Sequence, residues 1–141
     1  MSWLLDTNIL SELRRPQPEP RVEAFLASKP LDTLYVSVVT LAELRFGIEL
    51  VPDATRRAAI NDWLANRIRP MFDGRVLPIS EDIMLRWRLL VEEGRKFGHT
   101  FPQPDLIIAA TAIEHNLTLV TRDRSGFDKI RIPILNPWET S

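Results

Sequence analysis

Short apolar runs of strand-forming residues alternate with longer segments of helical periodicity along the whole chain. The runs occupy residues 3–5, 34–38, 75–79, 118–121 and 132–135, and the second is rich in β-branched and aromatic residues. Strands separated by helices pair in parallel through right-handed crossovers, which places helices on both faces of the sheet. We therefore expect an α/β fold with a central parallel sheet of four to five strands.

The segments between these runs carry apolar residues at helical spacing. They cover residues 22–26, 40–48, 54–72, 81–97 and 105–115. Ser80 is placed to cap the fourth helix, while Gly74, Gly98 and Asn116 are placed to end the third, fourth and fifth. Residues 14–20 hold three prolines and are expected to form a loop.

Composition limits the class of protein. With 141 residues, 45% of them hydrophobic, the chain can bury the core of one domain, and we expect a single domain over residues 1–141. The absence of cysteine excludes disulfide bonds and thiolate zinc sites, and it leaves oxygen and imidazole as metal ligands. No run is long enough to cross a bilayer, so we expect a soluble cytoplasmic protein without membrane association. The net charge of −1 argues against a surface coated in positive charge, although a local basic strip could still hold a phosphate backbone.

Four acidic residues follow strands or begin helices at one side of the expected sheet. Asp6 comes directly after the first strand and Asp123 after the fourth, while Glu43 and Asp105 lie near the starts of two helices. In open parallel sheets, ligands bind outside the carboxyl ends of the strands, where the strand order reverses. The topology therefore predicts that these four carboxylates share one site.

Such a cluster needs a counter-charge. Two carboxylates about 4 Å apart repel each other by about 4 kcal/mol at an effective dielectric of about 20. A hard divalent cation, Mg²⁺ or Mn²⁺, takes oxygen ligands and keeps water molecules available for attack on a phosphodiester. Asn8 and Thr121 are expected to support the ligands through neutral oxygens. Asp128 is expected to be a turn or surface residue, and the alternative is that it serves as a fifth metal ligand.

Each acid also has a local explanation, which stays open at this point. Asp6 can cap a short helix, and Glu43 stands three residues after Thr40 in a capping box. Asp105 can be an N-cap or a first-turn acid, and Asp123 can be a turn residue. Only the shared edge of the sheet makes the four a candidate site.

Four segments of the chain resemble, in order and spacing, the four motifs of PIN-domain nucleases. They are Leu-Leu-Asp-Thr-Asn at 4–8, Thr-Leu-Ala-Glu-Leu-Arg-Phe-Gly at 40–47, Asp-Leu-Ile-Ile-Ala-Ala-Thr-Ala at 105–112 and Leu-Val-Thr-Arg-Asp at 119–123. Each motif alone is short, but the ordered set is specific. Within the family the chain is most similar to the VapC and FitB toxins of bacterial toxin–antitoxin pairs, and Leu-Asn-Pro-Trp at 135–138 resembles the FitB-type tail.

The resemblance implies a three-layer α/β/α sandwich and a Mg²⁺- or Mn²⁺-dependent endoribonuclease that cuts an RNA substrate. It also implies a homodimer and a cognate antitoxin that blocks the site and carries the complex to operator DNA. On this resemblance Asp6, Glu43, Asp105 and Asp123 hold the metal and carry the catalysis, with Glu43 helping to deprotonate the attacking water. Arg122 and Arg124 are candidates to bind the RNA backbone, with ordinary solvated turn arginines as the alternative.

Other functions fit the sequence less well. A phosphatase of the haloacid-dehalogenase kind needs a second acid at position 8, where this chain has Asn8, and a response-regulator receiver needs an aspartate after the third strand, where this chain has Ser80. The non-enzymatic alternative is a catalytically silent PIN-like binding module that acts through an antitoxin and operator DNA. Trp63 and Trp87 lie on apolar helical stripes and indicate core or interface, which leaves Trp138 as a candidate for base stacking.

Overall fold

The computed structural model describes residues 1–100, 103–127 and 129–139, and its centre is a five-stranded parallel sheet. The strands are β1 (Trp3–Leu5), β2 (Leu34–Ser37), β3 (Val76–Leu77), β4 (Thr118–Val120) and β5 (Ile134–Leu135). Their order across the sheet is β3-β2-β1-β4-β5, so the direction of winding reverses between β1 and β4. The predicted parallel α/β fold is confirmed, and the reversal puts a ligand-binding crevice at the ends of β1 and β4.

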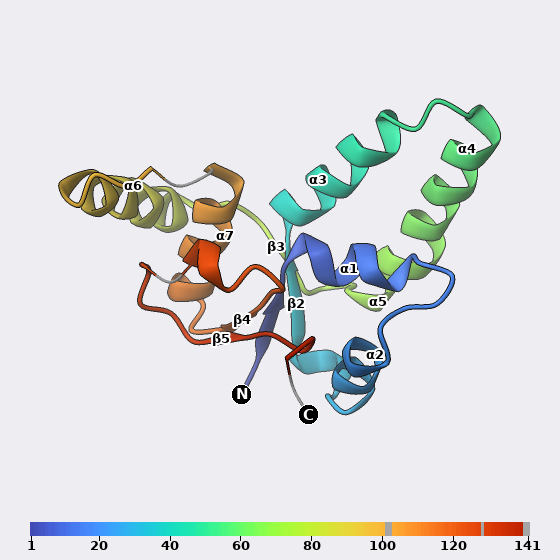
Figure 1. The fold of residues 1–141 in the computed structure, drawn as a ribbon, viewed down its shortest axis with the longest axis horizontal. Coiled ribbons are helices and arrows are strands. Elements are labelled where there is room, and N and C mark those ends of the chain that lie inside the picture. Colours follow the sequence, from blue (N-terminus) through green and yellow to red (C-terminus); the bar gives the residue numbers. More distant parts are fainter. Residues whose placement is uncertain (101–102, 128, 140–141) are drawn as a thin grey trace.

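Helices cover both faces of this sheet (Figure 1). One face carries α1 (Thr7–Leu13), α2 (Pro20–Ala27), α3 (Val38–Glu49), α4 (Ala54–Trp63) and α5 (Arg69–Met71), and the other carries α6 (Glu81–Lys96) and α7 (Gln103–Glu114). Successive strand residues point to opposite faces, so Leu5 packs into the first core while Leu4 packs into the second. The result is the three-layer α/β/α sandwich. None of the described helices is long and apolar enough to span a membrane.

The start of α3 differs from the prediction. The helix begins at Val38, and the Ser37 side chain caps it by accepting a hydrogen bond from the Val39 N–H at 3.0 Å. Thr40 is therefore an interior helical residue, fully buried, and its predicted capping box with Glu43 is wrong. Both Ser37 and Thr40 are good N-cap residues, and the end of β2 at Ser37 decides between them.

Two further boundaries differ from the sequence-based expectation. Pro20 was expected in a loop but occupies the first position of α2, where its missing N–H has no helical partner to lose. The expected single helix over 54–72 contains a π-helical segment, Leu64–Ile68, directly before α5. Pro70 explains it, because a proline removes a helical donor and crowds the preceding turn. Asn116, with φ of 53°, ends α7 in the left-handed conformation as predicted.

Candidate active site

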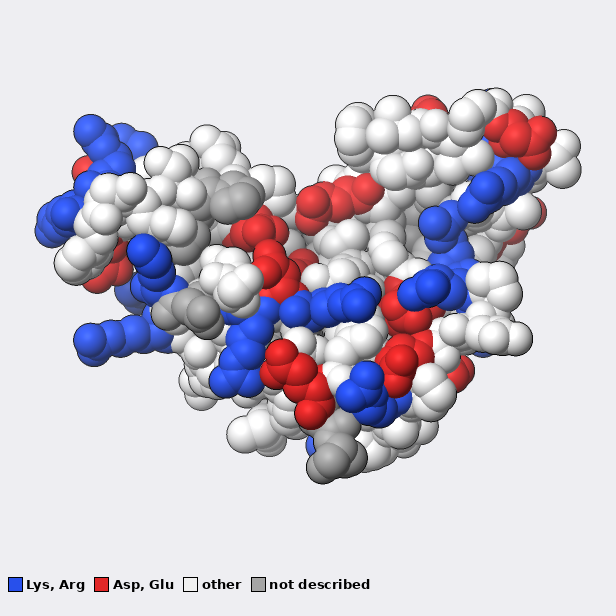
Figure 2. Space-filling model, in the orientation of Figure 1, with Lys and Arg blue, Asp and Glu red and all other residues white. Residues whose placement is uncertain are grey.

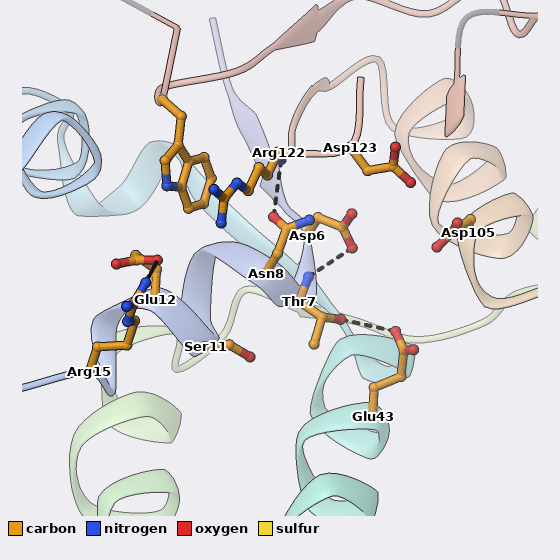
Figure 3. A pocket seen from close by; sticks show the side chains of 11 residues that line it. Asp6, Thr7, Asn8, Ser11, Glu12, Arg15, Glu43, Asp105, Arg122 and Asp123 are labelled. Atoms are coloured by element: carbon orange, nitrogen blue, oxygen red, sulfur yellow. Dashed lines mark hydrogen bonds and ion pairs between the residues drawn. The ribbon is translucent and has the colours of Figure 1, made fainter. Parts of the chain in front are cut away.

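The four predicted acids line one pocket of about 430 Å³ at the carboxyl ends of β1 and β4. Asp6 follows β1, Asp123 follows β4, Glu43 lies on the second turn of α3 and Asp105 on the first turn of α7. Figure 3 shows all four carboxylates facing a common space. In the space-filling view of Figure 2, acidic surface gathers in the hollow between the α6–α7 side and the α3 side of the molecule.

Asp6 is the buried floor of this pocket, with 5% of its surface exposed. One carboxylate oxygen accepts a hydrogen bond from the Thr7 N–H at 2.7 Å, and the other accepts one from the Thr121 hydroxyl at 2.8 Å. Burial raises the pKa of Asp6 above its usual value, the two hydrogen bonds oppose that rise, and the charges of Glu43 and Asp123 add to it. Asp6 is thus both the helix cap of α1 and a pocket residue.

Glu43 is held by the helix that Asp6 caps. Its Oε1 accepts a hydrogen bond from the Thr7 hydroxyl at 2.9 Å, and Thr7 also lies 3.5 Å from the Thr40 hydroxyl. The sequence analysis left open, as the local alternative to a site role, that the Glu43 carboxylate caps its own helix. In the structure the carboxylate bridges from α3 to α1 instead.

Asp105 is held in the pocket against an electrostatic cost. Its pKa is raised from 3.8 to about 6, first by burial and then by the negative charges of Asp6, Asp123 and Glu43, in that order. Within the described residues its carboxylate has no hydrogen-bond partner to offset this cost. Its place in the first turn of α7, as expected, gives the carboxylate only the favourable field of the helix N-terminus.

Asp123 is anchored in a turn as well as facing the pocket. Its Oδ1 accepts hydrogen bonds from the Ser125 hydroxyl at 3.2 Å and from the Gly126 N–H at 3.0 Å. Its own N–H donates to the Thr121 hydroxyl oxygen at 3.1 Å. Both the turn role and the pocket position therefore hold for this residue. Asp128, the possible fifth ligand, lies outside the described residues.

The two supporting residues act on the acids in different ways. Thr121 is fully buried and does not line the pocket; its hydroxyl donates to Asp6 and accepts from the Asn8 amide at 3.2 Å. Asn8 does line the pocket, and its amide oxygen accepts from the Arg122 N–H at 3.2 Å. Together they fix the loop after β4 against α1, which sets the position of Asp123 relative to Asp6.

Pocket residues on α1 were missed by the sequence analysis. Ser11, Glu12 and Arg15 line the pocket beyond Asn8. Glu12 is 5% exposed, and its carboxylate accepts hydrogen bonds from the Glu19 N–H at 2.9 Å and from Arg15 at 3.4 Å. The available signal was helical spacing, because positions 8, 11 and 12 share one face of the helix that starts at the site, whereas Arg15 lies just beyond the end of that helix.

The donor set fits a hard divalent cation in its chemistry. The four acids supply only oxygen ligands, and their mutual repulsion, seen in the pKa of Asp105, is what a cation would relieve. In the part of the chain that the structure describes, no group of three or more acidic or histidine side chains is yet arranged to hold a metal ion.

A family model for the PIN domain matches residues 3–133. The chain belongs to the PIN-domain family. It is 38% identical over 136 residues to VapC ribonuclease Y4jK of Sinorhizobium fredii, a match that covers 96% of this chain and 97% of that protein. It is also 38% identical over 135 residues to Toxin FitB of Neisseria gonorrhoeae, which covers 96% and 97% of the two chains.

The fold is that of solved PIN-domain relatives. The structure of FitAB bound to an IR36 DNA fragment matches with a TM-score of 0.91 and 35% identity over 99% of this chain and 97% of that one. The predicted family resemblance is therefore confirmed over nearly the whole sequence. The four motifs that carried it supply the four acids of the PIN-domain pocket described above.

Proposed function

We propose that this PIN-domain chain is a metal-dependent endoribonuclease and the toxin of a toxin–antitoxin pair. The observation that carries the proposal is the gathering of Asp6, Glu43, Asp105 and Asp123 in one pocket, with the pKa of Asp105 raised to about 6 by burial and by the other three. Similarity to a VapC ribonuclease and to Toxin FitB over nearly the full length supports it. Mg²⁺ or Mn²⁺ is the cation that such an oxygen-only site selects.

The four acids divide the work according to their contacts. The bound cation neutralises charge on the phosphodiester and lowers the pKa of water. Asp6 is the most firmly held ligand, because its two oxygens are oriented by Thr7 and Thr121. Asp105 has no competing hydrogen bond among the described residues, so its carboxylate is free to turn toward the cation.

We propose that Glu43 takes the proton of the attacking water. Its Oε1 is held by the Thr7 hydroxyl, while Oε2 has no partner among the described residues and is available to accept a proton. The water oxygen bonds to phosphorus, the bond from phosphorus to the 3′-oxygen breaks, and the 3′-oxygen takes a proton from solvent. The products are a 5′-phosphate and a 3′-hydroxyl.

The decisive experiment uses purified, antitoxin-free protein and structured RNA, with Mg²⁺, with Mn²⁺ and with a chelator. We expect cleavage only with metal, and a loss of at least about a hundredfold in the Asp105→Asn and Glu43→Gln variants. Asp32→Asn, which changes an exposed acid away from the pocket, is the matched control and keeps full activity. Cleavage that survives chelation, or that both pocket variants retain, contradicts the four-carboxylate mechanism.

Failure of the folded, metal-loaded protein to cut any RNA would favour the other reading of the fold, a catalytically silent binding module. Under both readings we propose a cognate antitoxin as partner, with operator DNA bound only through it. The solved FitAB assembly on DNA supports this choice. Co-expression with the antitoxin should give a DNA-binding complex, whereas the chain alone should not retard operator DNA.

We also propose that the chain is a homodimer. Large apolar side chains are exposed in pairs four residues apart: Phe46 on α3 with Leu50 at its C-terminal cap, and Leu85 with Leu89 on α6. Exposed apolar surface of this kind is what a protein partner covers. Light scattering on the purified chain tests the proposal directly, and a monomer at all concentrations would refute it.

A further inference from the structure

The pocket extends past the acids along α1 to Arg122 and Trp138. The guanidinium carbon of Arg122 lies 5.1 Å from the centre of the Trp138 ring, within the range of a cation–π contact. In the view of Figure 3, the Arg122 side chain lies on the opposite side of Asp6 from Asp105. The pocket thus has an acidic end and a second end that carries arginine.

Arg122 differs from the other arginines nearby in forming no ion pair with a described carboxylate, although its charge, after the hydrogen bond from Arg21, helps to lower the pKa of Glu19. Arg15, which also lines the pocket, pairs with Glu12 at 3.4 Å, and Arg124 pairs with Glu139 at 3.9 Å. No carboxylate of the described residues lies within ion-pairing distance of the Arg122 guanidinium. Its charge is therefore available to an incoming anion.

Asn136 links Arg122 to Trp138 through two hydrogen bonds. Asn136 is buried, with 6% exposure; its amide donates to the Arg122 carbonyl at 3.2 Å and its amide oxygen accepts from the Trp138 N–H at 2.9 Å. The Arg122 N–H donates to Asn8, so the backbone of Arg122 is held from α1 and from the C-terminal segment at once. A single buried side chain thus joins the two backbone segments from which the Arg122 guanidinium and the Trp138 ring project.

A guanidinium held in this way is suited to a phosphate. Stacking on the indole restrains the flexible arginine side chain and leaves the N–H groups at the guanidinium edge free to donate in a fixed fork. Charge-assisted, bidentate contacts to phosphate oxygens use this fork geometry. Four carboxylates repel the RNA backbone, so an unpaired cation in the same pocket is the feature that can draw the strand in.

We propose that Arg122, positioned by Trp138 and Asn136, binds a backbone phosphate of the RNA strand next to the phosphate that is cut. Arg124, two residues along and paired outside the pocket, takes no part. This rests on the proposed ribonuclease function and names the residue that positions its substrate. Arg122 is the binding residue, and Trp138 and Asn136 act through it.

Binding is measured apart from catalysis. In the Asp105→Asn background with a chelator present, the anisotropy of a labelled single-stranded RNA is followed over a salt series. We expect Arg122→Ala to weaken binding about tenfold at low salt and to lower the salt slope by about 0.7, the value for one phosphate of a single strand. Arg124→Ala is the matched control and leaves both quantities unchanged.

The role of Trp138 is tested by graded replacements. Trp138→Phe keeps a face for the guanidinium and should retain most of the affinity, whereas Trp138→Leu should reproduce the loss seen in Arg122→Ala. Arg122→Lys keeps the charge but loses the fork and should fall between the two extremes. Circular dichroism checks that each variant is folded. If Arg122→Ala or Trp138→Leu is not folded, the comparison uses Arg122→Lys in its place.

The outcomes separate this proposal from the proposed function. Equal losses in the Arg122→Ala and Arg124→Ala variants, or no measurable RNA binding by the Asp105→Asn protein, overturn the Arg122 subsite. In the active protein, Arg122→Ala should raise KM with little change in kcat, and Asp105→Asn should lower kcat. RNA binding that depends on Arg122 in a protein that never cleaves RNA would sustain the subsite and refute the nuclease.

Discussion

Neutralising Asp105 should stabilise the metal-free protein at neutral pH even as it abolishes activity. The pKa of Asp105 rises from 3.8 to about 6 on folding, chiefly through burial and then through the charges of Asp6, Asp123 and Glu43. At about 1.36 kcal/mol per pKa unit, keeping this group ionised in the folded state costs about 3 kcal/mol. Asp105 is only partly buried, and solvent screening reduces this to about 1–2 kcal/mol.

The pH dependence of this effect has a definite sign. Because the folded state binds the Asp105 proton more tightly than the unfolded state, the favourable contribution of the neutral form is complete below about pH 4 and is lost as pH rises through about 6. Asp105→Asn removes the charge at every pH. The variant should therefore gain about 1–2 kcal/mol over the wild type above about pH 6.5 and gain almost nothing near pH 4.

Thermal unfolding in a chelating buffer tests this reasoning. For a chain of this size about 1 kcal/mol moves Tm by about 2–4 °C, so Asp105→Asn should unfold about 3–6 °C higher at about pH 7.5. At about pH 4.5 the two proteins should agree, and Asp32→Asn should match the wild type at both. Added Mg²⁺ should stabilise the wild type more than the variant, because it binds the folded site. An Asp105→Asn protein that is less stable at neutral pH, or equally stabilised at both pH values, would refute the argument.

Four other substitutions, one of them a control, test separate features. A Cβ at position 126 would stand 2.5 Å from Asp123 Oδ2, so Gly126→Ala should displace that carboxylate and lower the rate of cleavage at least about tenfold. Gly47→Ala is the control: its Cβ would meet nothing within 4 Å at a helical position, so activity should stay and the free energy of unfolding should rise by about 0.5–1 kcal/mol. Glu12→Ala removes the buried carboxylate that accepts a hydrogen bond from the Glu19 N–H and should cost about 1–3 kcal/mol in urea unfolding, a cost that an unchanged midpoint would contradict. The indole N–H of Trp87 is buried and has no hydrogen-bond partner among the described residues, so Trp87→Phe should leave the midpoint unchanged or raise it, and a large loss of stability would contradict this.

The fold was predictable because its signals are local. Strand runs, helical periodicity and left-handed end residues such as Asn116 lie within a few positions of one another in the sequence. The errors arise where two local signals compete. Ser37 and Thr40 are both competent caps, and only the pairing of β2 with its neighbours shows where the strand stops.

The candidate site was predictable in its acids and not in their surroundings. Topology alone brings the ends of β1 and β4 together, and that is enough to gather Asp6 and Asp123. Some of the bonds that orient the acids join residues far apart in the chain, Thr121 to Asp6 and Thr7 to Glu43, and no local pattern predicts them. For the same reason the hydrogen bonds by which Asn136 links Arg122 to Trp138 could be seen only in the folded chain.

Three of the four acids combine a hydrogen bond that fixes their carboxylate with a place in the pocket. Asp6 caps α1, Asp123 anchors its turn and Glu43 bridges two helices. In each case a hydrogen bond offsets part of the free-energy cost of desolvating the carboxylate, which still faces the pocket. Asp105 has no such bond among the described residues, and its raised pKa is the cost. The ionised Asp105 carboxylate lowers the stability of the folded state, so folding does not require it. Its position in the pocket is explained by the metal-dependent reaction proposed for this site.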